Sequence, residues 1–128
     1  MGDMLTGRTA LITGSTSGIG AAYARALANE GAAIMLNGFG DSGEIETLRA
    51  GIADEYGVTV LYNGADMTKP NEIRGMVKDA TDRLGKVDIL INNAGLQHRD
   101  MVDDFPVEKW DALFDVNVKA PFIATQAV

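Results

Sequence analysis

The sequence predicts an α/β fold in which helices cover both faces of a parallel sheet. Short apolar segments alternate with helical segments in the order β-α-β-α-β-α-β-α. The strand-like segments are largely apolar throughout, which is typical of strands that are buried on both faces. Because crossovers between parallel strands are right-handed, this order predicts a doubly wound sheet of four strands and four helices.

The first two predicted strands flank the first predicted helix. Residues 9–13 (TALIT) and 32–37 (AAIMLN) are short apolar runs that indicate buried strands. Residues 19–30 carry apolar side chains at helical spacing and are followed by Gly31, a residue type common just past a helix end.

The second helix is predicted from near Asp41 to Gly57. Asp41 and Glu44 match a D-x-x-E capping box. Asp41 is therefore interpreted as a helix cap in preference to a ribose ligand. Residues 58–62 (VTVLY) follow as the third strand.

The third helix is predicted to begin at Thr68 and Pro70 and to stop at Gly85. Residues 87–91 (VDILI) form the fourth strand. Asp104 and Pro106 then open a fourth helix.

The fourth helix carries residues near i, i+3, i+4 and i+7: Trp110, Leu113, Phe114 and Asn117. This spacing predicts that Trp110 lies in the core. Three acidic residues near the helix start could suggest a metal, but they fit a solvated helix start better, and no metal is expected: Asp103, Asp104 and Asp111.

Composition limits the class of protein. The 128 residues, 46% of them apolar, suffice for one domain with a core, while a net charge of −7 argues against nucleic acid or an anionic membrane as the main partner. There is no cysteine, so disulfides and thiolate chemistry are excluded. With neither a signal peptide nor a run long enough to span a bilayer, the expected location is the cytoplasm.

The segment 13–20 (TGSTSGIG) follows a strand and opens a helix, which is the context of a dinucleotide-binding loop. Gly14 is expected to allow a tight turn, Gly18 to admit the pyrophosphate, and Gly20 to let the helix pack against the sheet. The helix amides would bind the phosphates, and three hydroxyls are expected beside them: Ser15, Thr16 and Ser17. An ordinary glycine-rich turn is the alternative.

The spacing T-G-x-x-x-G-x-G resembles the short-chain dehydrogenase/reductase family. The resemblance also includes residues 92–95 (NNAG) after the fourth strand, Asp66 after the third, and Asn117 in the last helix. It implies a Rossmann-like fold, a catalytic and structural role for Asn117, and an adenine contact for Asp66. The cofactor-binding residues that it implies are Thr13, Gly14, Ser15, Ser17, Gly18, Ile19, Gly20, Phe39, Ala65, Asp66, Met67, Asn93, Ala94, Gly95 and Val116.

Three short stretches are similar to one branch of the family, the bacterial D-3-hydroxybutyrate dehydrogenases: residues 37–41 (NGFGD), 95–98 (GLQH) and 104–110 (DFPVEKW). This similarity implies that Phe39 lies beside the adenosine and that Gln97 binds the substrate carboxylate. Phe39 as a core residue and Gln97 as an ordinary loop residue are the alternatives. His98, the one histidine, is assigned a structural or rim role.

NAD is the expected cofactor. A 2′-phosphate needs a nearby Arg or Lys, and residues 14–20 and 32–48 contain neither. No acid stands at the end of the second strand, where Asn37 and Gly38 leave room.

The family's Y-x-x-x-K pair is missing, since Tyr23, Tyr56 and Tyr62 lack a lysine four residues on. We therefore expect residues 1–128 to be the N-terminal part of a single dinucleotide-binding domain, with the C-terminal half absent and no turnover alone. The full-length protein would be a homotetramer acting on a short 3-hydroxy acid. An acyl-carrier-protein reductase and a non-catalytic nucleotide-binding module remain alternatives.

Overall fold

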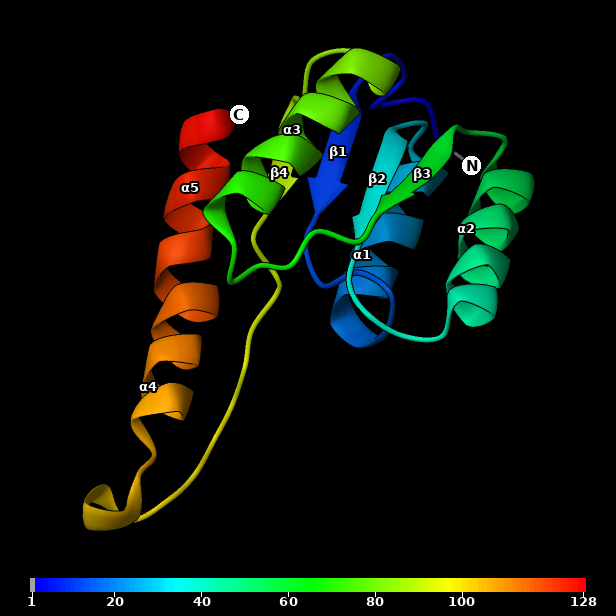
Figure 1. Cartoon of the computed structure of the whole chain (residues 1–128). Coiled ribbons are helices and arrows are strands. Elements are labelled where there is room, and N and C mark those ends of the chain that lie inside the picture. The colour runs from blue at the N-terminus through cyan, green and yellow to red at the C-terminus, as the bar shows by residue number, and fades with distance from the viewer. Residues whose placement is uncertain (1) are drawn as a thin grey trace.

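The computed structural model describes residues 2–128 and contains one parallel sheet with the strand order β3-β2-β1-β4 (Figure 1). The strands are β1 (Thr9–Ile12), β2 (Ala33–Asn37), β3 (Val60–Asn63) and β4 (Ile89–Ile91). Every pair is parallel, as predicted, and β4 lies at an edge of the sheet beside β1.

Four helical segments connect or follow the strands. The first three are α1 (Gly18–Asn29), α2 (Ser42–Tyr56) and α3 (Pro70–Leu84). The last runs without a break through α4 (Val107–Phe114), the π-helical segment η2 (Asp115–Lys119) and α5 (Ala120–Ala127), and a short 3₁₀ turn, η1 (Val102–Asp104), precedes it. The predicted elements are confirmed, with bounds shifted by one or two residues at most ends.

The sheet separates two apolar layers. Ala10 and Ile12 of β1 face α1 and α2, while Leu11 between them faces α3 and α5. Successive strand residues point to opposite faces, so a strand covered on both sides must be apolar throughout. This is the physical reason that the strands read as continuous apolar runs.

Asp41 caps α2, as the sequence predicted. Its Oδ2 accepts the Glu44 backbone N–H at 3.0 Å. Gly57 closes the same helix in a left-handed conformation, with φ of +67°. Both ends of α2 are therefore fixed by residues that the sequence identified.

The prediction that Trp110 is a core residue is wrong, because 55% of Trp110 is exposed. Figure 1 shows the α4 end of the last helix extending past the sheet, whereas α5 lies beside α3. The sheet therefore covers α5 and leaves the α4 aromatic residues uncovered. Helical spacing identifies an apolar face but cannot say which part of it the sheet reaches.

Within residues 2–128, no helix combines the length and the apolar character that crossing a membrane requires.

Candidate functional site

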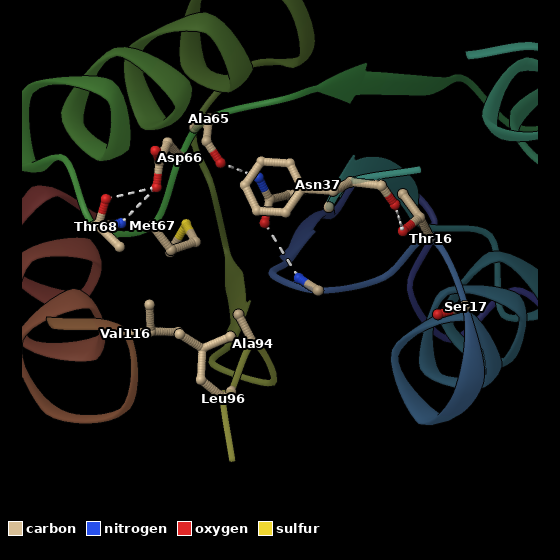
Figure 2. A pocket seen from close by; sticks show the side chains of 14 residues that line it. Thr16, Ser17, Asn37, Ala65, Asp66, Met67, Thr68, Ala94, Leu96 and Val116 are labelled. Carbon is tan, nitrogen blue, oxygen red and sulfur yellow. Dashed lines mark hydrogen bonds between the residues drawn. The ribbon is translucent and has the colours of Figure 1, made fainter. Parts of the chain in front are cut away.

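The carboxyl ends of the strands open onto a pocket of about 310 Å³ (Figure 2). Its wall combines the loops after β1, β2, β3 and β4 with one residue of η2. The lining residues are Gly14, Thr16, Ser17, Asn37, Gly38, Phe39, Ala65, Asp66, Met67, Thr68, Ala94, Gly95, Leu96 and Val116. A crevice at the carboxyl ends of the strands, beside the point where the strand order reverses, is where doubly wound sheets bind ligands.

The glycine-rich loop packs against the segment after β4. Gly14 has φ of +61°, and a Cβ at this position would lie 2.9 Å from the Ala94 Cα. A Cβ on Gly20 would lie 2.3 Å from the Gly14 carbonyl oxygen, so α1 can start directly on the loop. The expected turn at Gly14 is confirmed, and the close neighbours of Gly20 are the loop backbone and the Asn93 side chain.

Gly18 faces open space. Its φ is +55°, and a Cβ there would meet no other atom within 4 Å. The next residue, Ile19, is 69% exposed on the first turn of α1. The first N–H groups of a helix have no partner inside it, so this open side of the loop presents donors suited to an anion.

The side chains of two predicted cofactor residues, Thr13 and Asn93, join the loop after β1 to the segment after β4. The Thr13 Oγ1 accepts the Asn93 N–H at 3.0 Å and the Ala94 N–H at 2.9 Å, and the Asn93 Nδ2 donates to the Gly14 carbonyl at 3.0 Å. The expectation that the Ser15 hydroxyl lies beside the phosphate-binding amides is wrong. Ser15 is fully buried, and its hydroxyl donates to the Ile12 carbonyl at 2.7 Å.

Asn37 occupies the end of β2 and is 1% exposed. Its Oδ1 accepts the Gly14 N–H at 3.1 Å, and its Nδ2 donates to the carbonyls of Asn63 and Ala65, each at 3.1 Å. Figure 2 shows the amide between the loops after β1 and β3. The side chain at the strand end is thus fully engaged with the backbone of both loops.

The segment after Asn37 forms one wall of the pocket. Phe39 is 68% exposed, which rules out its interpretation as a core residue under α2. The Thr16 hydroxyl donates to the Phe39 carbonyl at 2.9 Å, and the Tyr62 hydroxyl donates to the Gly38 carbonyl. Gly38 lines the pocket, as expected of a residue that leaves room at the strand end, and a Cβ there would lie 2.5 Å from the Thr16 Oγ1.

Asp66 forms a tight turn at the opposite wall (Figure 2). Its Oδ1 accepts the Thr68 N–H at 2.9 Å and the Thr68 hydroxyl at 2.7 Å. These two hydrogen bonds, with a smaller contribution from Lys69, hold the pKa of the Asp66 carboxyl below its usual value, against the effect of burial. The group therefore stays ionised near neutral pH, with its second oxygen able to accept further hydrogen bonds.

Asn117 lies in the π-helical segment and binds the backbone after β4. Its Oδ1 accepts the Leu96 N–H at 2.8 Å, and its Nδ2 donates to the Leu96 carbonyl at 2.9 Å. Its neighbour Val116 lines the pocket, so η2 turns one residue toward the pocket and the next toward the loop. Here the Asn117 side chain fixes the position of that loop.

Gln97 and His98 lie outside the pocket. With its amide oriented to satisfy both groups, Gln97 accepts hydrogen bonds from Arg99 at 3.2 Å. The His98 ring meets Phe105 edge-on at 5.2 Å between centroids, consistent with a structural role. Among residues 2–128, no three His, Asp or Glu side chains form a group that could hold a metal ion.

The structure brings together most of the predicted site. Residues of the predicted set line the pocket in nine cases: Gly14, Ser17, Phe39, Ala65, Asp66, Met67, Ala94, Gly95 and Val116. The others support or flank it: Thr13, Ser15, Gly18, Ile19, Gly20, Asn93, Gln97 and Asn117. Lining residues that were not predicted as ligands are Thr16, Asn37, Gly38, Thr68 and Leu96. Four of them directly adjoin a predicted residue in the sequence, which is the signal that could have identified them, whereas Asn37 has no such neighbour.

Comparison with known proteins gives one consistent answer. Residues 8–128 match the model of the short chain dehydrogenase family. The chain is 53% identical over 115 residues to a D-beta-hydroxybutyrate dehydrogenase of Rhizobium meliloti, covering 90% of this chain and 45% of that protein. It is 49% identical over 124 residues to a D-beta-hydroxybutyrate dehydrogenase of Cupriavidus necator, covering 96% of this chain and 47% of that protein.

A solved short chain dehydrogenase from Burkholderia cenocepacia, in complex with NADP, superposes with a TM-score of 0.91 at 35% identity. The match covers 97% of this chain and 50% of that one. The chain thus spans about half the length of the relatives that it matches.

Proposed function

Because the chain belongs to the short-chain dehydrogenase family, we propose that it forms the N-terminal, NAD-binding part of an oxidoreductase acting on (R)-3-hydroxybutyrate. The reaction would transfer a hydride between NAD and the 3-hydroxybutyrate/acetoacetate pair. The observation that carries the proposal is the pocket where the TGSTSGIG loop, the Asp66 turn and the NNAG segment meet. The choice of substrate is supported by the names of the relatives that are 53% and 49% identical.

The pocket residues divide by the part of the dinucleotide that they would hold. We assign the pyrophosphate to the Ser17 hydroxyl and the open amides at the start of α1, because this side of the loop is free of neighbouring side chains. We assign the adenosine to the space between the exposed Phe39 ring and Asp66, where an aromatic face and an ionised acceptor flank the same pocket. A pocket volume of about 310 Å³ lies at the lower end of the range for ligand sites.

The nicotinamide end would meet the residues after β4. Ala94, Gly95 and Val116 line that side of the pocket. The bound cofactor would supply the hydride chemistry, and Asn117 would keep the adjoining Leu96 segment in place. Gln97 would bind the substrate carboxylate. Its amide oxygen accepts from Arg99, so its amide N–H groups would be the donors to that carboxylate.

NAD is favoured over NADP because no Lys or Arg of residues 2–128 lines the pocket. The cation that α2 carries, Arg49, is paired with Glu46 at 2.6 Å and donates to the Val60 carbonyl at 2.9 Å. Lys69, next to the Asp66 turn, also faces carboxylates, with its Nζ 3.6 Å from Glu72 and 4.0 Å from Asp66. A 2′-phosphate would therefore enter a pocket whose neighbouring cations are already paired. The Burkholderia dehydrogenase was solved in complex with NADP, so the two cofactors have to be compared directly in this protein.

We further propose that the protein is a homo-oligomer. The last helix exposes a row of apolar residues at intervals of three or four, on one face of the helix: Val107, Trp110, Phe114, Val118 and Phe122. An exposed apolar face of this kind is typical of an interface between subunits.

The test uses the protein at its full encoded length. NADH and NADPH affinities are measured by the change in dinucleotide fluorescence, and turnover is measured as NADH formed from NAD with (R)-3-hydroxybutyrate. We expect tighter binding of NADH than of NADPH, and turnover with the (R) enantiomer only. Tighter NADPH binding would reverse the cofactor assignment. Dinucleotide binding without turnover on hydroxy acids would favour a nucleotide-binding module, and no binding of either dinucleotide would refute the proposal.

A further inference from the structure

We propose that Asn37 is a positioning residue that fixes the phosphate side and the adenine side of the pocket relative to each other. The proposal rests on the dinucleotide-binding function proposed above. It identifies the side chain that joins the two halves of that site.

Asn37 is bonded to both loops at once. On the phosphate side, its Oδ1 accepts the N–H of Gly14, the first glycine of the loop, at 3.1 Å. On the adenine side, its Nδ2 donates at 3.1 Å to the carbonyls of Asn63 and Ala65, and Ala65 directly precedes Asp66. The side chain is 1% exposed, so water does not offer these groups substitutes.

The chemistry of the amide explains why an acid is missing from this strand end. Asparagine combines an acceptor oxygen with two N–H donors, and the backbone around it presents one N–H and two carbonyls. A carboxylate would keep the bond from Gly14 but would turn an anionic oxygen toward two carbonyl oxygens. An apolar side chain of the same size would leave these three backbone groups, which are buried or partly buried, without their partners.

The next position does not accept an acid either. Gly38 has φ of +148°, and a Cβ there would lie 2.5 Å from the Thr16 Oγ1. Both positions at the end of β2 are thus occupied by residues that the surrounding loops require. The end of β2 therefore positions the neighbouring loops and supplies no acidic side chain to bind the ribose.

A ligand that spans both loops gains most from a fixed distance between them. Adenosine alone needs only the adenine side, whereas ADP must reach both the adenine side and the phosphate loop. When the loops are already in register, the ligand does not have to order them on binding. Loosening Asn37 should therefore weaken ADP binding more than adenosine binding, while a general loss of folded protein would weaken both equally.

The experiment compares Asn37→Asp with the wild-type protein at its full encoded length. Affinities for ADP and adenosine are measured by competition against NADH fluorescence. We expect Asn37→Asp to weaken ADP binding by about tenfold or more, the effect of losing hydrogen bonds at buried carbonyls, and adenosine binding by much less. Asn71→Asp, at an exposed position of α3, adds the same charge and should leave both affinities unchanged.

The outcomes separate the two proposals. A wild-type protein that binds neither NADH nor ADP refutes the proposed function, and the role of Asn37 falls with it. A wild-type protein that binds both, with Asn37→Asp binding ADP as tightly or losing ADP and adenosine equally, overturns the role of Asn37 alone. If Asn37→Asp does not fold, Asn37→Thr decides, because its hydroxyl can accept from Gly14 and donate to one carbonyl. It should show a smaller loss, still selective for ADP.

Discussion

Gly14 and Gly18 both adopt left-handed backbone conformations, but they differ in what surrounds them. A Cβ on Gly14 would press on the backbone of Ala94, at 2.9 Å from its Cα, whereas a Cβ on Gly18 would meet open space. The first glycine is therefore needed for packing between the two loops. The second leaves the open side of the loop clear.

This difference predicts unequal effects of the same substitution. Gly18→Ala should cost about 1 kcal/mol of folding free energy, the cost of a left-handed alanine. Gly14→Ala should cost about 3 kcal/mol, because the Ala94 backbone must also move. Urea denaturation of the two variants measures both values.

For NADH binding, Gly18→Ala should have a larger effect than its small cost in stability suggests. Gly18→Ala places a methyl group on the open side of the loop, so it should weaken NADH binding although it unfolds the protein little. Equal stabilities of the two variants would contradict the packing role of Gly14.

At the scale of elements, Asp88 joins the start of β4 to the start of β1. Its Oδ2 accepts the Thr9 N–H at 2.9 Å, and its Oδ1 lies 3.2 Å from the Lys86 Nζ and 3.4 Å from the Arg8 Nη1. The Thr9 N–H is the main cause that holds the pKa of Asp88 below its usual value, with Lys86 and Arg8 adding to it and burial opposing it. The edge strand is thus held by a charge as well as by its ladder.

The depressed pKa fixes the sign of a pH effect. The native state favours the ionised carboxyl more than the unfolded state does, so the stabilisation is present above the ordinary Asp value of 3.8 and is lost as the pH falls through the lower folded value. Asp88→Asn should be less stable than wild type at pH 7, and the gap should narrow as the pH drops below about 4. Urea titrations at pH 7, 5, 4 and 3 measure the gap.

Asp82→Asn is the matched control, since Asp82 pairs with Lys78 on an exposed face of α3 at 2.6 Å. It should change stability little at any of these pH values. A gap for Asp88→Asn that stays constant from pH 7 to pH 3 would show that the charge of Asp88 does not stabilise the β1–β4 contact.

The elements could be predicted from sequence where the signal is local. The α2 cap depends on Asp41 and Glu44, three residues apart, and the apolar strand runs report burial on two faces directly. The core prediction for Trp110 was wrong because helical spacing is the same whether the apolar face of a helix meets the sheet or remains exposed. The neighbour that decides between these cases is distant in sequence.

At the scale of the whole molecule, the site also contains parts that the sequence could predict and a part that it could not. The glycine-rich loop and the NNAG segment are contiguous, so their residue types and spacing identify them. Asn37 was missed as a site residue because its partners lie 23, 26 and 28 residues away and become neighbours only when the sheet forms. A side chain that joins loops has no local pattern to recognise.

The row of exposed apolar residues on the last helix leads to the last prediction. Trp110 and Phe114 lie at its centre, with ring centroids 4.7 Å apart, and each is about half exposed or more. Covering these rings in a subunit interface would bury large apolar surface, worth roughly 1.5–3 kcal/mol for a side chain of this size. Phe114→Glu should therefore weaken self-association at least about tenfold. Sedimentation velocity across a concentration series measures this, with Thr47→Glu on the exposed side of α2 as a control that adds the same charge. If Phe114→Glu and Thr47→Glu sediment like the wild type at every concentration, the row is not an interface between copies of the chain.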